Sequence, residues 1–166
     1  MSRAFVKEND LEHAGIDIPE RPLSDEPNYV TPRGLSLLNQ TIDDLEKERE
    51  ALITKKDDPM VKQKIAVIER DMRYFAARIE SAILTNPQEE DRSHVLFGAK
   101  VTMEDEEAQF LTFEIVGEDE ANIKESKISY ASPIGRALIG KELDDSIEVK
   151  TPGGLIHYEV MEVIYA

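Results

Sequence analysis

Two stretches of apolar residues at heptad spacing, separated by a short charged segment, constrain the fold of this chain most strongly. The first seam skips one position, which Arg49 occupies, and the second seam is unbroken. Spacings of three and four residues place the seam on one face of a helix, which must be buried against another surface. The seam positions are Leu35, Leu38, Ile42, Leu45 and Leu52 in the first stretch, and Val61, Ile65, Ile68, Met72, Phe75, Ile79 and Ala82 in the second.

Each stretch begins with a helix-start signal. Thr31-Pro32 and Asp58-Pro59 both place a side chain that can cap a helix directly before a proline, which suits the first helical position. We expect the second helix to end at Asn86-Pro87, because the residue before a proline disfavours helix. Since so few residues separate the two helices, they must fold back antiparallel, each spanning roughly 35 Å.

The tip of this predicted hairpin, which covers residues 32–86, allows two interpretations. Two adjacent carboxylates could hold a magnesium ion. Alternatively, Asp58 caps the second helix and the neighbouring charges stabilise the two helix ends, which explains the tip without a metal. The tip residues are Lys55, Lys56, Asp57 and Asp58.

The apolar period changes to alternation near residue 94, which predicts β-strands. Acidic residues 104–107 and the turn at 151–154 predict hairpin connections. A short helix is expected at Pro133–Ile139, closed by Gly140. A small α+β domain at 94–166 therefore follows a linker at 87–93. Its expected strands are residues 94–103, 109–117, 127–131, 146–150 and 155–165.

Residues 1–31 contain three prolines and no sustained apolar period. This composition predicts an irregular leader before the hairpin. We expect a few apolar side chains to attach the leader to the folded body. These candidates are Ile16, Ile18, Tyr29 and Val30.

The charge distribution narrows the classes of partner. The 166 residues carry a net charge of −15, and residues 87–166 alone carry 7 basic and 18 acidic side chains. Such an acidic region disfavours independent binding to nucleic acid. The chain has no cysteine, and His13, His94 and His157 lack metal-ligand spacing, so we expect no resident cofactor. No apolar segment has transmembrane or signal-peptide length, which predicts a cytoplasmic protein without membrane contact.

The segment ISYASPIGRALIGKELDDSIEVKTPGG, Ile128–Gly154, carries the most specific signal. Its pieces are the strand Ile128-Ser129, the pair Ser132-Pro133, the run RALIGKE and the turn TPGG. Together with HVLFGAKV, and with RDMRYFAARIESA in the second predicted helix, they resemble the GreA/GreB family of bacterial transcript-cleavage factors. The resemblance runs from Tyr29 to the end of the chain.

This resemblance implies a coiled-coil hairpin followed by an antiparallel sheet of the FK506-binding-protein type with one short helix. It also implies that this second domain docks at the rim of the secondary channel of RNA polymerase while the hairpin enters the channel. In the family, acidic tip residues of a motif LGDxSENAEY hold a magnesium ion, and the polymerase itself cleaves the RNA. On this basis, the expected docking residues are Tyr130, Ala131, Ser132, Pro133 and Arg136.

The sequence departs from the family pattern in three ways. It lacks the acidic tip motif, and the hairpin is shorter by about fifteen residues, or about two helical turns in its reach. In addition, Ala131 stands where some members carry an acid. We therefore expect a monomeric, non-enzymatic protein that modulates transcription without strong stimulation of cleavage. Alternatives are an active cleavage factor that uses Asp57 and Asp58, an adaptor that pairs with another coiled coil, and an enzyme with its own pocket.

Overall fold

A computed structural model of the chain describes residues 18–86 and 93–165. The described residues form two compact units, one of residues 18–25 with 38–80, and one of residues 26–37 with 81–165. Ile16, His13 and the predicted linker up to residue 92 lie outside the described residues. The domain boundaries expected from the sequence stay predictions.

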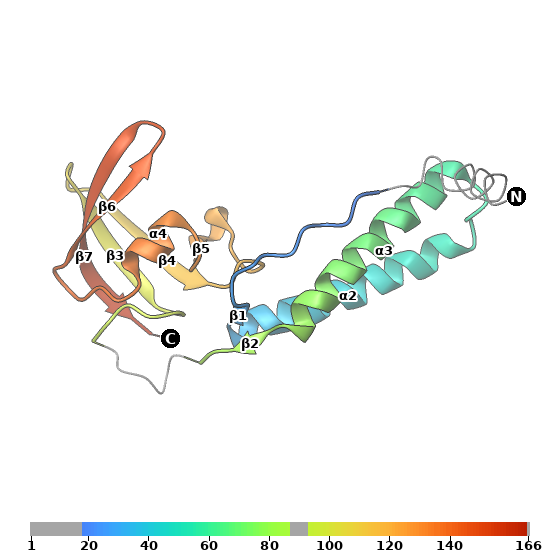
Figure 1. The fold of residues 1–166 in the computed structure, drawn as a ribbon, viewed down its shortest axis with the longest axis horizontal. Coiled ribbons are helices and arrows are strands. Elements are labelled where there is room, and N and C mark those ends of the chain that lie inside the picture. The colour runs from blue at the N-terminus through green and yellow to red at the C-terminus, as the bar shows by residue number, and fades with distance from the viewer. Residues whose placement is uncertain (1–17, 87–92, 166) are drawn as a thin grey trace, which may run out of the picture. The chain divides into compact units, whose positions relative to one another are not determined.

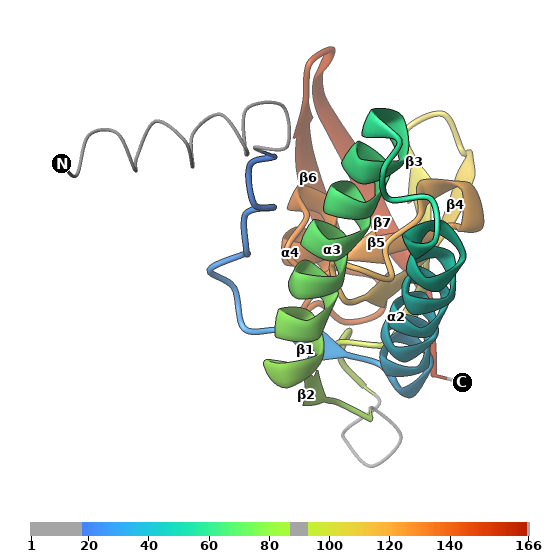
Figure 2. The same ribbon diagram turned by 90° about the vertical axis from the view of Figure 1, so that its right-hand side faces the viewer.

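The two predicted helices form a hairpin. Helix α2 spans Pro32–Ile53 and helix α3 spans Pro59–Glu80, each with 22 residues, and they run side by side in both views (Figures 1 and 2). Every predicted seam position is buried or half-buried. At the skipped position, Arg49 Nε donates to Glu69 Oε1 at 2.8 Å, so an ion pair replaces an apolar contact between the helices. The two seams are confirmed.

Both predicted helix starts are capped. Asp58 Oδ1 accepts from the Met60 N–H at 2.9 Å, and the Asp58 carbonyl accepts the first helical bond from Lys62. Thr31 Oγ1 accepts from the Gly34 N–H at 2.9 Å in the same way. Each cap satisfies an N–H that has no partner within its own helix.

The predicted end of the second helix is wrong. Helix α3 stops at Glu80, and strand β2, Ile83–Leu84, pairs in parallel with strand β1, Tyr29–Val30 (Figure 2). The Ile83 N–H donates to the Asn28 carbonyl at 2.8 Å, and the Thr85 N–H donates to the Val30 carbonyl at 2.9 Å. The residues before Pro87 thus take their backbone bonds from a segment far away in sequence, which local helix signals do not reveal.

The second unit contains a five-stranded sheet in the order β5-β4-β3-β7-β6, with helix α4, Pro133–Leu138, against it (Figure 1). All neighbouring strands are antiparallel except β4 and β5, so the predicted antiparallel sheet has one parallel pair. A 3-10 turn, η2, at Ile123–Glu125 precedes β5. The α+β class is confirmed. The strands are β3 Lys100–Asp105, β4 Phe110–Val116, β5 Lys127–Ser129, β6 Ser146–Thr151 and β7 Gly154–Ile164.

The first predicted strand is too long, because residues 94–99 lie outside the ladder of β3. Gly98 has a φ of 88°, a left-handed conformation that suits glycine, and its N–H donates to the Ile115 carbonyl at 2.8 Å. The side chains of Val95, Phe97 and Ala99 are nevertheless all buried. Alternation in the sequence therefore identifies the buried positions correctly but not the backbone conformation.

The core of this unit includes part of the predicted leader. Val30 is 4% exposed, and Tyr29 packs against Phe97 and Tyr130 with ring centroids 6.0 and 5.3 Å away. A Cβ on Gly117 would lie 2.5 Å from the Tyr29 carbonyl oxygen, so this close approach requires glycine. The expectation that Tyr29 and Val30 attach the leader is confirmed. No helix in the described ranges combines the length and the apolar character needed to cross a membrane.

Candidate functional site

The loop between β5 and α4 is held by its own serines. Ser132 Oγ accepts from the Gly135 N–H at 3.1 Å and donates to the Ser129 carbonyl at 2.6 Å. The Ala131 N–H donates to Ser129 Oγ at 3.0 Å. Ser132 is thus the N-cap of α4, as the Ser-Pro pair predicts, and Pro133 is exposed at the first helical position.

Gly135 allows α4 to lie directly against the end of β5. Gly135 is buried, and a Cβ there would lie 2.2 Å from the Ser129 carbonyl oxygen. No side chain fits in that space. The loop from Tyr130 to Pro133 therefore has a conformation fixed by close backbone packing rather than by the serine caps alone.

Arg136 is the exposed basic residue of this surface. Its Nε donates to the Ala131 carbonyl at 2.8 Å, which ties the guanidinium to the loop. Its Nη2 forms an ion pair with Glu26 Oε1. The side chains of Arg136 and Glu26 are 60% and 39% exposed, so both groups can meet solvent or a partner.

Tyr130, another predicted docking residue, is only 8% exposed. Its hydroxyl donates to the Pro27 carbonyl, and its ring packs edge-on against Tyr29 and Phe97. The structure thus brings Ala131, Ser132, Pro133 and Arg136 together at the surface and places Tyr130 beneath them. The surface formed by Glu26, Ala131, Ser132, Pro133 and Arg136 is hereafter called the docking surface, after the role that the resemblance implies for its loop.

Sequence reasoning missed Glu26, which is 110 residues away from its partner Arg136. Its position within an irregular, proline-containing segment offers no periodic or motif signal. The apolar character of Tyr29 does predict that this residue attaches the leader to the second unit. That attachment is the one indication that neighbouring leader residues are held against the same unit.

The hairpin tip is exposed, and its turn is closed by backbone hydrogen bonds. Lys55, Lys56, Asp57 and Asp58 are all exposed. The Lys55 N–H donates to the Leu52 carbonyl at 2.9 Å, and the Asp58 N–H donates to the Lys55 carbonyl at 3.1 Å, which closes a tight turn. Within the described part of the chain, no three His, Asp or Glu side chains gather as metal ligands would.

A buried carboxylate lies near the start of α2. Glu120 is 7% exposed and accepts from Thr31 Oγ1 at 2.5 Å and from Arg33 Nε at 2.6 Å. Arg33 Nη2 also donates to Glu114 Oε1 at 2.7 Å. The hydrogen bonds to Glu114 and Glu120 raise the pKa of Arg33 above its ordinary value, despite some desolvation. The carboxylate is thus fully paired, as a buried charge must be.

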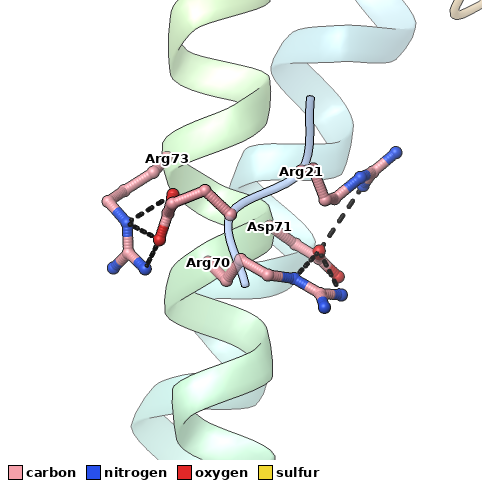
Figure 3. Close-up of polar contacts among 5 residues, drawn as sticks. Arg21, Arg70, Asp71 and Arg73 are labelled. Atoms are coloured by element: carbon pink, nitrogen blue, oxygen red, sulfur yellow. Dashed lines mark hydrogen bonds and ion pairs between the residues drawn. The ribbon is translucent and has the colours of Figure 1, made fainter. Parts of the chain in front are cut away.

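The leader also contacts the hairpin through a charged cluster (Figure 3). Arg73 Nη2 donates to Glu20 Oε1 at 2.5 Å, and this hydrogen bond holds the pKa of Glu20 below its ordinary value. The guanidinium of Arg21 lies 3.8 Å from the centre of the Tyr74 ring and 3.5 Å from Asp71 Oδ1. These contacts combine ion pairing with a cation–π interaction.

A hairpin of two helices and an α+β unit with a Ser-Pro loop at its surface define a two-part protein of the kind that the Gre resemblance implies. A family profile described as "Transcription elongation factor, GreA/GreB, C-term" matches residues 89–165. The chain is 37% identical over 152 residues to transcription elongation factor GreA of Verminephrobacter eiseniae, covering 82% of this chain and 96% of that protein. The chain therefore belongs to the GreA/GreB family of transcription elongation factors.

A second relative matches a shorter stretch of the chain at higher identity. Transcription elongation factor GreA of Legionella pneumophila is 58% identical over 72 residues, which is 43% of this chain and 45% of that protein. The chain thus matches less than half the length of that relative. The solved structure of a GreA/GreB elongation factor from Nitrosomonas europaea aligns at 23% identity and a TM-score of 0.42, covering 83% of this chain and 99% of that one.

Proposed function

We propose that this protein binds RNA polymerase at the rim of the secondary channel and modulates transcription elongation. The α+β unit docks through the loop between β5 and α4, and the hairpin enters the channel. The observation that carries this proposal is the capped Ser132-Pro133 pair beside Arg136, with Ser132 half-buried and Pro133 exposed, in the part of the chain that the GreA/GreB profile matches. A preformed loop binds at a lower entropic cost than a mobile one.

Charge supports a protein partner with a basic surface. The region from residue 87 onward has 18 acidic and 7 basic side chains. Opposite charges on the two partners accelerate their encounter. At physiological ionic strength, salt screens the attraction between exposed charges that are more than roughly 8 Å apart. Binding should therefore weaken as salt rises. In this proposal the protein acts as a monomer and does not bind nucleic acid by itself.

The structure of the hairpin tip supports the proposal that the protein modulates transcription without strongly stimulating RNA cleavage. Asp58 is engaged as the cap of α3, and the tip lysines lie in the turn that follows the end of α2 at Ile53. Metal-assisted hydrolysis tolerates little misplacement of its ligands, and a shorter hairpin has less reach. A hairpin in the channel could affect nucleotide entry without reaching the metal. Any hydrolysis is performed by the polymerase.

A binding measurement tests the docking surface. Ser132→Glu places a charge in the loop and should raise the Kd for RNA polymerase at least tenfold, about 1.4 kcal/mol. Ser146→Glu, on the exposed edge strand β6, adds the same charge elsewhere and should leave the Kd within about twofold. If both variants bind RNA polymerase with the Kd of the unchanged protein, the protein does not dock through the loop at Ser132. Thermal unfolding of each variant confirms that it is folded.

The alternative cleavage factor is tested separately, because both tip carboxylates are exposed. In a stalled-complex assay, we expect this protein to give little cleavage, and Asp57→Ala with Asp58→Ala to leave that level unchanged. Strong cleavage that the double substitution abolishes would establish the alternative. An adaptor for another coiled coil would instead show no polymerase binding at all.

A further inference from the structure

The leader brings a carboxylate to the docking surface. Residues 130–136, YASPIGR, contain no acidic residue, whereas Glu26 forms an ion pair with Arg136 at their edge. Arg136 is in turn bonded to the Ala131 carbonyl at 2.8 Å. The charge pattern of this surface therefore depends on a residue outside the loop.

The segment that carries Glu26 is built into the unit rather than laid over it. The next residue, Pro27, accepts a hydrogen bond from the buried Tyr130 hydroxyl. Asn28 is 4% exposed and its Nδ2 donates to Ser81 Oγ at 3.2 Å. Tyr29 then enters the core and the β1–β2 ladder. Glu26 is consequently held in a fixed position beside the loop.

Two physical facts favour recognition over stabilisation as the role of this pair. An exposed ion pair contributes little to folding stability, and both side chains here are at least 39% exposed. A carboxylate has about four acceptor positions, so a carboxylate that pairs with an arginine can also accept from other donors. Charged groups at the rim of an interface chiefly set specificity and association rate.

We propose that Glu26 is a specificity-determining residue of the docking surface, and that it pairs with a basic side chain of the partner. This inference rests on the proposed function, so the partner used in its test is RNA polymerase. It extends the docking surface beyond the loop, to a leader residue that the loop's sequence does not include.

The first test compares Glu26→Gln with Glu107→Gln, which removes an equal charge from the exposed β3–β4 turn. Glu26→Gln should raise the Kd for RNA polymerase about tenfold at low salt, and the difference should shrink as salt rises. Glu107→Gln should change the Kd by less than about twofold. Equal effects of the two substitutions would overturn the inference.

A charge exchange separates recognition from structural support. Glu26→Arg combined with Arg136→Glu keeps an ion pair between positions 26 and 136. The exchange reverses the positions of the positive and negative charges that the partner contacts. We expect thermal stability to match the unchanged protein and the Kd to stay at least tenfold higher. Recovery of normal binding in this variant would show that the pair only supports the fold, and would overturn the inference.

Ser132→Glu in the same series distinguishes the two levels of the proposal. If it weakens binding and Glu26→Gln does not, the loop still docks and only the role of Glu26 is wrong. If the unchanged protein does not bind RNA polymerase, both the inference and the proposed function fall.

Discussion

The hairpin tip and the docking surface are both exposed and charged, but they are held in different ways. At the tip, Asp58 caps the helix that directly follows it, and the turn closes through bonds between residues three apart. At the docking surface, Arg136 meets Glu26 and Tyr130 meets Pro27, more than 100 residues away in sequence. The tip is thus a local structure, whereas the docking surface exists only in the folded unit. The following variants test this difference.

The largest effect is expected at Gly135. Replacing it with alanine puts a Cβ 2.2 Å from the Ser129 carbonyl oxygen, so α4 must move away from β5. We expect the free energy of unfolding to fall by about 2–3 kcal/mol. Urea denaturation measures it. Gly153→Ala is the matched control, since its Cβ would find only Thr151 Oγ1 at 3.8 Å. Equal stability of the two variants would mean that the loop is not held by this packing.

A second long-range contact is tested by Thr31→Val. The substitution removes the hydroxyl that donates to the buried Glu120 and that caps α2, so we expect a loss of about 2 kcal/mol. Thr102→Val removes a hydroxyl from the half-buried Thr102–Thr112 pair and should cost less than about 1 kcal/mol. Urea denaturation compares the two. A larger loss for Thr102→Val would contradict the assignment of Glu120 as a buried, fully paired charge.

At the tip, the effects should be smaller and should separate its two aspartates. Asp58→Ala removes the cap of α3 and should cost about 1 kcal/mol, whereas Asp57→Ala should stay within about 0.5 kcal/mol. Thermal unfolding measures both. If Asp57→Ala proved the more costly, the capping explanation of the tip would be wrong.

The smallest effect concerns the leader contact at Glu20. Its pKa is lowered by the hydrogen bond from Arg73, so the contact favours the folded state fully above the ordinary value of 4.5. The contribution is lost as pH falls through the lowered pKa. An NMR titration of the Arg73 Nε–H resonance should show this loss only below pH 4.5, and Glu20→Gln should abolish it. A transition above pH 4.5 would contradict the pairing.

The sequence predicts the local structures of this protein better than those that depend on contacts between distant residues. The seams, the caps at Thr31 and Asp58, and the Ser132-Pro133 helix start all rest on residues a few positions apart, and all are confirmed. The predicted end of α3 and the predicted start of β3 are wrong, because hydrogen bonds to backbone groups far away in sequence determine where these elements end and begin. Glu26 could not be found at all, since its role depends on a contact with Arg136 that only folding creates.

Cross-linking tests the central claim of docking through the loop most directly. The chain has no cysteine, so a photoreactive probe can be attached at a single introduced position, Pro133→Cys or Lys56→Cys. With RNA polymerase, we predict that the probe at 133 cross-links to the rim of the secondary channel and the probe at 56 to its interior. Cross-links from neither position, or to a polymerase surface away from the channel, would contradict the account.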